Sequence, residues 1–221
     1  MNLVEGQKLV DAFLGQHFTE KQRLRSRNNL LTRSVRKAKL KGLFLEFGVM
    51  NGESINHLAK IKRNQKFYGF DCFTGLPEDW SEYYPKGHMK VDNIPFVRRN
   101  VELVVGLFQN TLKPFLEIHK ENVAYLHLDA DLYSSTKYVL FTLAKEDRLQ
   151  KGTIIEFDEV FFQDSHETLL DDEHRVFKEF IEVFDIDFRW LWFFQYRSTT
   201  RASLIISHFG GSRVPKRCPN Y

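Results

Sequence analysis

The sequence predicts an α/β fold, in which a doubly wound, mostly parallel sheet of about seven strands carries an antiparallel C-terminal strand. Short apolar runs alternate with longer segments of helical periodicity along most of the 221 residues, a pattern typical of parallel βαβ units with helices on both faces of the sheet. Two of these runs, 123–129 and 153–158, are almost continuously apolar, as expected for strands that are buried on both sides. A chain of this length fits one domain.

The predicted elements follow one another in a regular order. We expect strands at 43–47, 66–71, 101–106, 123–129, 153–158, 188–194 and 202–207, and helices at 54–62, 111–120, 134–149 and 171–184. The last two strands are joined too closely for a crossover helix and should pair antiparallel. Residues 72–99, with three prolines and two glycines, are expected to form a long loop that carries at most a short helical turn.

Charge is unevenly distributed along the chain. Lys and Arg total 32 against 29 Asp and Glu, yet residues 21–41 hold nine basic residues and no acidic one. We therefore divide the chain into a helical, basic N-terminal segment (1–40), a main domain (41–210) and a C-terminal tail (211–221). The basic stretch suits an anionic ligand, but apolar residues recur in it at helical spacing and favour the solvated face of an amphipathic helix. It contains no aromatic residue of the kind that interleaves cations in single-stranded nucleic-acid grooves.

Composition excludes several classes of protein. Hydrophobic residues make up 43% of the chain and aromatic residues 14%, which rules out disorder as the main state. No apolar run approaches the roughly 18 residues of a membrane-spanning helix, and the N-terminus lacks the layout of a signal peptide. Two cysteines are too few for a disulfide framework or a thiolate zinc site. We expect a cytoplasmic protein with no membrane partner.

Unusual residues stand directly after the predicted strands, where open α/β sheets bind their ligands. In the turn from Gly48 to Gly52, the glycines let a ligand approach the backbone, and the following helix presents free N–H groups to an anion. Ser54 could donate its hydroxyl to a ligand carboxylate. Asp71 ends the second strand about twenty residues further on, where an acidic residue accepts hydrogen bonds from ribose hydroxyls. Together these features favour nucleoside binding, although neither the dinucleotide nor the phosphate-loop glycine motif occurs.

Two acidic pairs follow the fourth and fifth strands, Asp129 with Asp131 and Asp158 with Glu159. If these strands are neighbours the pairs converge, and four carboxylates cannot all remain ionised together without a cation. An oxygen-rich pocket of this kind suits Mg²⁺ or a similar divalent ion. His127 shares one face of its strand with Asp129. It is a candidate general base, a partner of a ligating residue, or a histidine of the core.

Four segments, in this order, resemble the macrocin O-methyltransferase family: LEFGVMNGES (45–54), YGFDCFTGLPEDW (68–80), HLDADLYSST (127–136) and GTIIEFDE (152–159). Members of that family are class I, Rossmann-like, S-adenosylmethionine-dependent and metal-assisted enzymes that methylate sugar hydroxyls in natural products. The likeness covers about residues 40–207. It implies a small-molecule hydroxyl acceptor, a sugar or natural-product glycoside, and a homo-oligomer. Because residues 72–99 are rich in aromatic residues, glycine and proline, we also expect this loop to cover the site and help exclude water.

The resemblance also implies roles for individual residues. S-adenosylmethionine would be held by Glu46, Gly48, Met50, Gly52, Ser54 and Asp71. The segment GLFQ (106–109) also looks like the adenine-side segment of catechol-type O-methyltransferases, which adds Phe108 and Gln109 to the cofactor site. A divalent cation such as Mg²⁺ would be bound by Asp129, Asp158 and Glu159. Catalysis would involve Asp129, Asp131 and His127, and Asp131 could be a metal ligand, an orienting group or the base.

Two other classes of protein compete with this interpretation. Asp129-Ala130-Asp131 after an apolar strand also resembles the Asp-x-Asp motif of metal-dependent glycosyltransferases, but that alternative explains neither the glycine turn nor the acidic pair at 158–159. The basic stretch 21–41 could belong to a nucleic-acid-binding protein. That hypothesis has no recognition motif beyond charge, so nucleic acid is an unlikely partner.

Overall fold

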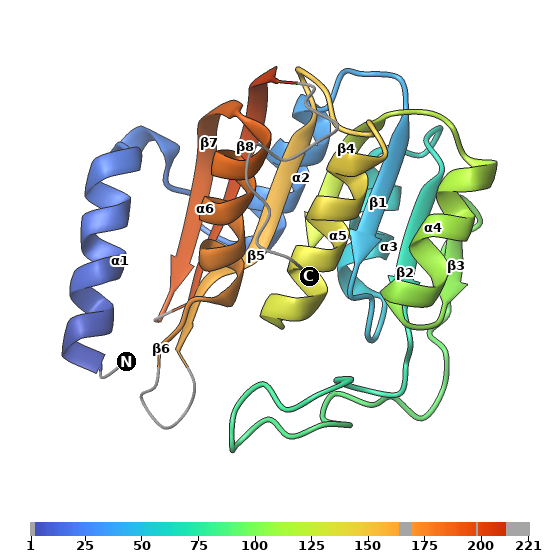
Figure 1. The fold of residues 1–221 in the computed structure, drawn as a ribbon, viewed down its shortest axis with the longest axis horizontal. Helices are drawn as coiled ribbons and strands as arrows, with labels where there is room; N and C mark the ends of the chain where they lie inside the picture. The colour runs from blue at the N-terminus through green and yellow to red at the C-terminus, as the bar shows by residue number, and fades with distance from the viewer. Residues whose placement is uncertain (1–2, 164–168, 198, 211–221) are drawn as a thin grey trace.

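The computed structural model describes residues 3–163, 169–197 and 199–210, and has one central sheet with helices on both faces (Figure 1). The strands are β1 (Leu43–Phe47), β2 (Phe67–Asp71), β3 (Val101–Val105), β4 (Val123–Leu128), β5 (Ile154–Gln163), β6 (Leu169–Leu170), β7 (Ile186–Tyr196) and β8 (Thr199–Phe209). Seven of them lie in the order β3-β2-β1-β4-β5-β8-β7, and β6 pairs with β5 outside this path.

The strand directions confirm the predicted fold class. Neighbouring strands from β3 to β5 pair parallel, whereas β8 pairs antiparallel with both β5 and β7. Strand order reverses beside β1, since the chain adds β2 and β3 on one side and β4 and β5 on the other. The carboxyl ends of β1 and β4 therefore form the switch point at which such sheets bind ligands.

Helices cover both faces of the sheet. Figure 1 shows α4 (Phe108–Ile118), α5 (Tyr133–Lys145) and α6 (Asp172–Phe184) in front of it, and α2 (Arg27–Lys37) and α3 (Glu53–Ile61) behind. Each layer has its own buried core: Leu112 and Val139 belong to the front cluster, and Leu31 and Ile55 to the rear one. Helix α1 (Leu3–His17) adds Phe13 to the front cluster.

Several boundaries differ from the sequence prediction. The last two strands are longer than predicted, because they continue pairing with each other as far as Tyr196 and Thr199. The helix predicted over 134–149 ends at Lys145, and Asp147 just beyond it takes a left-handed φ of 55°. Residues 72–100, all within the described part of the chain, form no helix and only an isolated bridge between Ser81 and Tyr84. The predicted tail, 211–221, lies outside the described residues.

The N-terminal segment is attached to the edge strand β7. The Leu24 backbone N–H donates to the Phe193 carbonyl at 2.8 Å, and the Gln22 side chain reaches the Trp190 carbonyl at 3.3 Å. Ser26 then caps α2 by accepting a hydrogen bond from the Asn29 N–H at 3.2 Å. These contacts fix where α2 begins.

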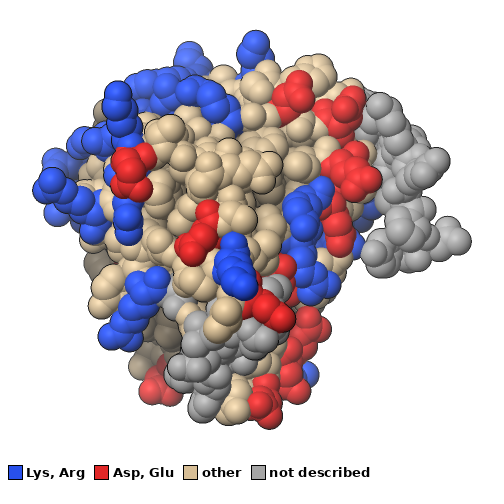
Figure 2. Space-filling view, turned by 90° about the vertical axis from the view of Figure 1, so that its left-hand side faces the viewer, with Lys and Arg blue, Asp and Glu red and all other residues tan. Residues whose placement is uncertain are grey.

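The basic residues of this segment mostly face solvent, as expected for an amphipathic helix. Figure 2 shows Lys and Arg gathered at the upper left of its view and the acidic residues mainly at the right. The exposed cations of the segment are Lys21, Arg23, Arg25, Arg33, Arg36, Lys37, Lys39 and Lys41. Arg27 is the ninth, and it is half-buried. Among the described residues, none of the helices has both the length and the apolar character needed to cross a membrane.

Gly69 in β2 lets α3 approach the sheet closely. A Cβ at this position would lie 2.5 Å from Ile55 Cδ1 and 2.7 Å from Val49 Cγ2. We expect Gly69→Ala to lower the free energy of unfolding by about 1–3 kcal/mol, because both neighbours are buried and have to shift. Urea unfolding followed by circular dichroism measures this.

The matched control is Gly15→Ala, in α1, where a Cβ meets nothing within 4 Å. There alanine should stabilise by up to about 1 kcal/mol, because it has the higher helix propensity. Equal effects of the two substitutions would contradict the close packing of α3 on β2.

Candidate active site

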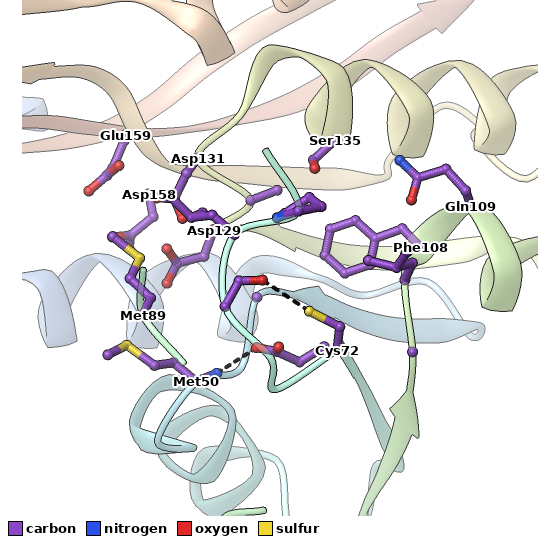
Figure 3. Close-up of a pocket in the computed structure, with 18 of the residues that line it drawn as sticks. Met50, Cys72, Met89, Phe108, Gln109, Asp129, Asp131, Ser135, Asp158 and Glu159 are labelled. Carbon is purple, nitrogen blue, oxygen red and sulfur yellow. Dashed lines mark hydrogen bonds between the residues drawn. The ribbon is translucent and has the colours of Figure 1, made fainter. Parts of the chain in front are cut away.

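A pocket of about 310 Å³ opens at the carboxyl ends of the central strands, at the switch point (Figure 3). The predicted site residues that line it are Gly48, Met50, Asp71, Phe108, Gln109, Asp129, Asp131, Asp158 and Glu159. Figure 3 shows Asp129, Asp131, Asp158 and Glu159 at one end of the pocket and Phe108 with Gln109 at the other. Four further predicted residues are not part of the lining, namely Glu46, Gly52, Ser54 and His127.

The turn after β1 requires glycine at its first position. Gly48 has a φ of 92°, and a Cβ there would collide with the Asp129 carbonyl oxygen. The two strand ends are also joined by a hydrogen bond from the Asp129 N–H to the Phe47 carbonyl at 2.9 Å. Direct backbone contact between the ends of β1 and β4 therefore forms the floor of the pocket.

Asp71, at the end of β2, holds this turn in place. Its Oδ2 accepts hydrogen bonds from the Val49 and Met50 N–H groups, each at 2.8 Å, and its Oδ1 accepts one from the Phe73 N–H at 2.7 Å. An ionised carboxylate has about four acceptor positions, so these three bonds leave about one for a ligand hydroxyl. Asp71 is thus both a support for the glycine turn and a wall of the pocket.

A series of buried, hydrogen-bonded side chains lies beneath the pocket; we call Ser54, Glu46, His127 and Asp158 the buried polar chain. Glu46 accepts a hydrogen bond from the Ser54 hydroxyl at 3.0 Å and lies 2.9 Å from His127 Nδ1. His127 Nε2 lies 3.4 Å from Asp158 Oδ1. Burial alone would lower the pKa of His127, but hydrogen bonds to Asp158 and Glu46 outweigh it and raise the pKa well above its ordinary value. The His127 ring therefore links two buried carboxyl groups and has no surface exposed to the pocket.

The pairing of β4 with β5 brings Asp129 and Asp158 together, as their sequence positions predicted. One guanidinium bridges them: Arg27 Nη2 lies 2.6 Å from Asp129 Oδ2, and Arg27 Nε lies 2.6 Å from Asp158 Oδ1. Arg201 Nε binds the other Asp158 oxygen at 3.0 Å. Burial opposes ionisation of Asp158, but the His127 hydrogen bond and both arginines hold the pKa of this carboxyl well below its usual range.

A second acidic group borders the first. The Glu159 backbone N–H donates a hydrogen bond to Glu173 Oε2 at 3.1 Å. The Glu159 carboxyl group is hydrogen-bonded to that of Asp131. Burial and mutual repulsion raise the pKa of all three carboxyl groups well above their usual range. Asp131 also has a left-handed φ of 56°, a conformation that Asp tolerates better than most residues. This group keeps protons to a higher pH than an ordinary carboxyl does.

An irregularity in the pairing of β5 changes the positions of Asp158 and Glu159. Register with β8 shifts between Phe157 and Phe161, although β5 was predicted to end at Asp158. Neighbouring residues of a regular strand point to opposite faces, whereas a bulge redirects side chains. The irregularity explains how both members of this acidic pair line one pocket.

Segment 72–99 closes one side of the pocket. Cys72, Leu76 and Met89 belong to the lining, and Trp80 anchors the segment to the start of α6 by donating to Asp172 Oδ2 at 3.1 Å. The Trp80 ring also stacks on Phe162, with centroids 4.9 Å apart. The predicted loop therefore contributes directly to the pocket.

Two site residues, Arg27 and Arg201, do not stand out in the sequence. Arg27 is one of nine cations with nothing in its neighbourhood to distinguish it, apart from Ser26 as a helix cap. Arg201 precedes the position at which the last strand was predicted to begin. Only the packing of α2 and β8 beside β5 brings both guanidinium groups to Asp158.

A family model described as a methyltransferase domain matches residues 45–160, just over half of the chain. The chain belongs to this family of methyltransferase domains. The match covers the glycine turn, Asp71 and both acidic pairs. It favours the methyltransferase interpretation over the glycosyltransferase alternative. A search of curated proteins finds no significant match.

Solved methyltransferase structures share the fold at low sequence identity. The calicheamicin methyltransferase CalS11 aligns with a TM-score of 0.61 and 23% identity over 80% of this chain and 76% of its own. The O-methyltransferase NovP aligns with 0.60 and 16% identity over 82% and 80%. A Bacillus cereus O-methyltransferase in complex with SAH aligns with 0.52 and 19% identity over 93% and 90%. At such identities the likeness establishes the Rossmann-like fold.

The buried chain beneath the pocket has a consequence for stability. We expect Glu46→Ala to lower the free energy of unfolding by about 3–5 kcal/mol, because it leaves the His127 cation and the Ser54 hydroxyl without their buried partner. Urea unfolding measures the loss. Glu117→Ala, on the exposed side of α4, is the control and should change stability by no more than about 0.5 kcal/mol. A comparable loss in both variants would argue against the buried ion pair.

Proposed function

We propose that this protein is an S-adenosylmethionine-dependent O-methyltransferase that acts on a hydroxyl group of a small molecule, with a sugar or glycoside as the acceptor class. The observation that carries the proposal is one pocket, at the switch point of a methyltransferase domain, that combines the glycine turn, Asp71 and a group of carboxyl side chains. Similar structures support it: CalS11 is a TDP-rhamnose 3'-O-methyltransferase, and the Bacillus cereus O-methyltransferase holds SAH.

The residues around the pocket suit this cofactor. The turn from Gly48 to Met50 places backbone at the pocket wall, and Asp71 keeps acceptor capacity for a ribose hydroxyl. Phe108 and Gln109, at the start of α4, offer a ring face and an amide at the opposite end of the pocket for a nucleobase. Glu46, Gly52 and Ser54 support the turn from below. When bound, S-adenosylmethionine supplies an electrophilic methyl group on a sulfonium.

We assign the acceptance of the hydroxyl proton to the carboxylate of Asp131. It lines the pocket, has a strained backbone conformation and is paired with Glu159. A raised pKa brings a carboxylate closer to the range in which it can take a proton from a hydroxyl group. His127 is fully buried and acts instead as a positioning residue for Asp158.

The sequence also predicts a divalent metal ion here, and the contacts of the predicted ligands test whether they have atoms free to bind it. His127, Asp129 and Asp158 can each present one ligand atom within 4.8 Å of the others. However, both Asp158 oxygens already accept hydrogen bonds from arginine, and Asp129 is paired with the same guanidinium. Both ring nitrogens of His127 already face carboxyl oxygens, those of Glu46 and Asp158, and Glu159 is paired with Asp131. As arranged, these residues do not fit a divalent ion, and the proposed chemistry proceeds without one.

The position of segment 72–99 supports a role for it in covering the site. It contributes an apolar wall to the pocket through Leu76, Pro77 and Met89. Exclusion of water favours methyl transfer to the acceptor over side reactions. We propose that this segment bounds the acceptor site.

Calorimetry with S-adenosylhomocysteine tests the cofactor site. Wild-type protein should bind it, and Asp71→Ala should weaken binding at least about tenfold, because the variant loses both the ribose acceptor and the support of the glycine turn. Asp92→Ala, in the exposed part of segment 72–99, should bind like the wild type. If wild-type protein fails to bind S-adenosylhomocysteine, the proposed function is wrong.

Transfer of a labelled methyl group to a panel of sugar nucleotides, glycosides and phenols tests the reaction. Asp131→Asn should lower kcat by about 10²–10⁴ with S-adenosylhomocysteine affinity unchanged, because it removes the proton acceptor. The wild-type rate should rise with pH above the usual range of carboxyl groups, since the pKa of Asp131 is raised and the base must lose its proton.

The control for this variant is Asp147→Asn, because Asp147 has the same left-handed conformation, with a φ of 55°, beyond the end of α5. It should leave the rate and its pH dependence unchanged. A rate of methyl transfer by Asp131→Asn equal to that of the control would remove Asp131 from the proposed role.

A further inference from the structure

The guanidinium of Arg27 lies between Asp129 and Asp158, in the position where the sequence predicts a divalent cation. We infer that Arg27 is a built-in counter-cation that takes the place of a metal in this pocket, and that removing its charge turns the same carboxylates into a metal site. The inference deepens the proposed function and rests on it for the consequence in catalysis. The binding measurement described below requires no methyl transfer.

The contacts of Arg27 are those of a bridging cation. Two different nitrogens of one planar group reach two carboxylates at 2.6 Å each. Charge-assisted hydrogen bonds of this kind are short and strong, and the guanidinium remains charged at any ordinary pH. The bridge relieves the repulsion that two adjacent carboxylates would otherwise have.

The charges around Asp158 balance without a further cation. Two guanidinium groups, Arg27 and Arg201, contact the carboxyl groups of Asp129 and Asp158, so two basic groups face two acidic ones. Glu159 and Asp131 are paired with each other. A divalent ion added to this arrangement would introduce an unmatched double charge in a partly buried site, which is unfavourable.

Arg27 is held in this position by the fold. Its neighbour Ser26 caps α2, and Leu24 is bonded to β7 by its backbone. One turn further along α2, Leu30 and Leu31 are fully buried. Because the chain is anchored on both sides of Arg27, the bridge does not depend on a freely moving surface side chain.

A metal and this guanidinium exclude each other for steric and electrostatic reasons. Mg²⁺ needs about six oxygen ligands at roughly 2.0–2.1 Å in near-octahedral geometry. One oxygen of each carboxyl group already accepts a hydrogen bond from an Arg27 nitrogen, at 2.6 Å. A divalent ion between the same carboxylates would also lie a few ångströms from a like charge.

Titration with Mn²⁺, followed by the loss of its free electron paramagnetic resonance signal, tests the inference on the full-length protein. Wild-type protein should show no binding in the pocket, whereas Arg27→Ala should bind Mn²⁺ at least about a hundredfold more tightly, because a like charge next to the ion is removed. Arg27→Met, which keeps the packing of the side-chain stem without its charge, should behave in the same way. It replaces Arg27→Ala if that variant does not fold.

Three controls assign the effect to the pocket and to charge. Arg27→Lys keeps the charge and should bind no Mn²⁺. The double variant Arg27→Ala/Asp129→Asn should lose the gained binding, because one carboxylate ligand is removed. Arg25→Ala removes an exposed cation from the same segment and should behave like the wild type.

The inference is overturned if wild-type protein binds Mn²⁺ as tightly as Arg27→Ala, or if folded Arg27→Met binds none. Calorimetry with S-adenosylhomocysteine on the same samples separates this result from the proposed function. Failure of the wild type to bind S-adenosylhomocysteine contradicts the proposed function, whereas the Mn²⁺ results alone decide the role of Arg27.

Discussion

Repulsion between Asp129 and Asp158 is the constraint on which the rest of the site depends. Parallel pairing of β4 with β5 puts both carboxylates at one edge of the sheet, where each raises the energy of the other's charge. Three basic side chains contact Asp158 and offset this repulsion: Arg27 from α2, His127 from β4 and Arg201 from β8. Elements far apart in the chain are thereby held together at the point where the pocket opens.

The buried polar chain extends this arrangement into the core. His127 takes part in it as a cation between Glu46 and Asp158, and Glu46 in turn accepts the Ser54 hydroxyl at the start of α3. Burying so many charged groups is costly unless each one is paired. Since every member is hydrogen-bonded, the chain gives the walls of the pocket a defined position, which the binding of a ligand in a fixed orientation requires.

The N-terminal segment has a second role in this structure, because it contributes a side chain to the pocket. Most of its cations face solvent, in agreement with an amphipathic helix, but Arg27 turns into the pocket. A segment that precedes the region matched by the methyltransferase family model therefore completes the site of that domain. In the proposed enzyme, the charge that balances the acidic pocket comes from the chain itself.

The sequence by itself determined the order of strands and helices, the switch point and the residues that follow each strand. These depend on local periodicity, on glycine and proline, and on the rule that parallel strands end at a common edge. That rule is sufficient to predict that Gly48, Asp71, Asp129 and Asp158 lie around one pocket, and all four line it. The irregularity in β5 after Phe157 was beyond this reasoning, since it depends on pairing with β8.

Only the tertiary structure decided which side chains contact the two carboxyl groups and which predicted residues face the pocket. A cluster of carboxylates in a sequence indicates that a positive charge lies nearby. It does not indicate whether that charge belongs to a metal ion or to a guanidinium group. The choice of Arg27 among nine cations arises from long-range packing of α2 beside β5, and the withdrawal of Ser54 and His127 from the pocket arises from their burial against Glu46. Contacts between residues more than a hundred positions apart leave no local pattern from which they could be predicted.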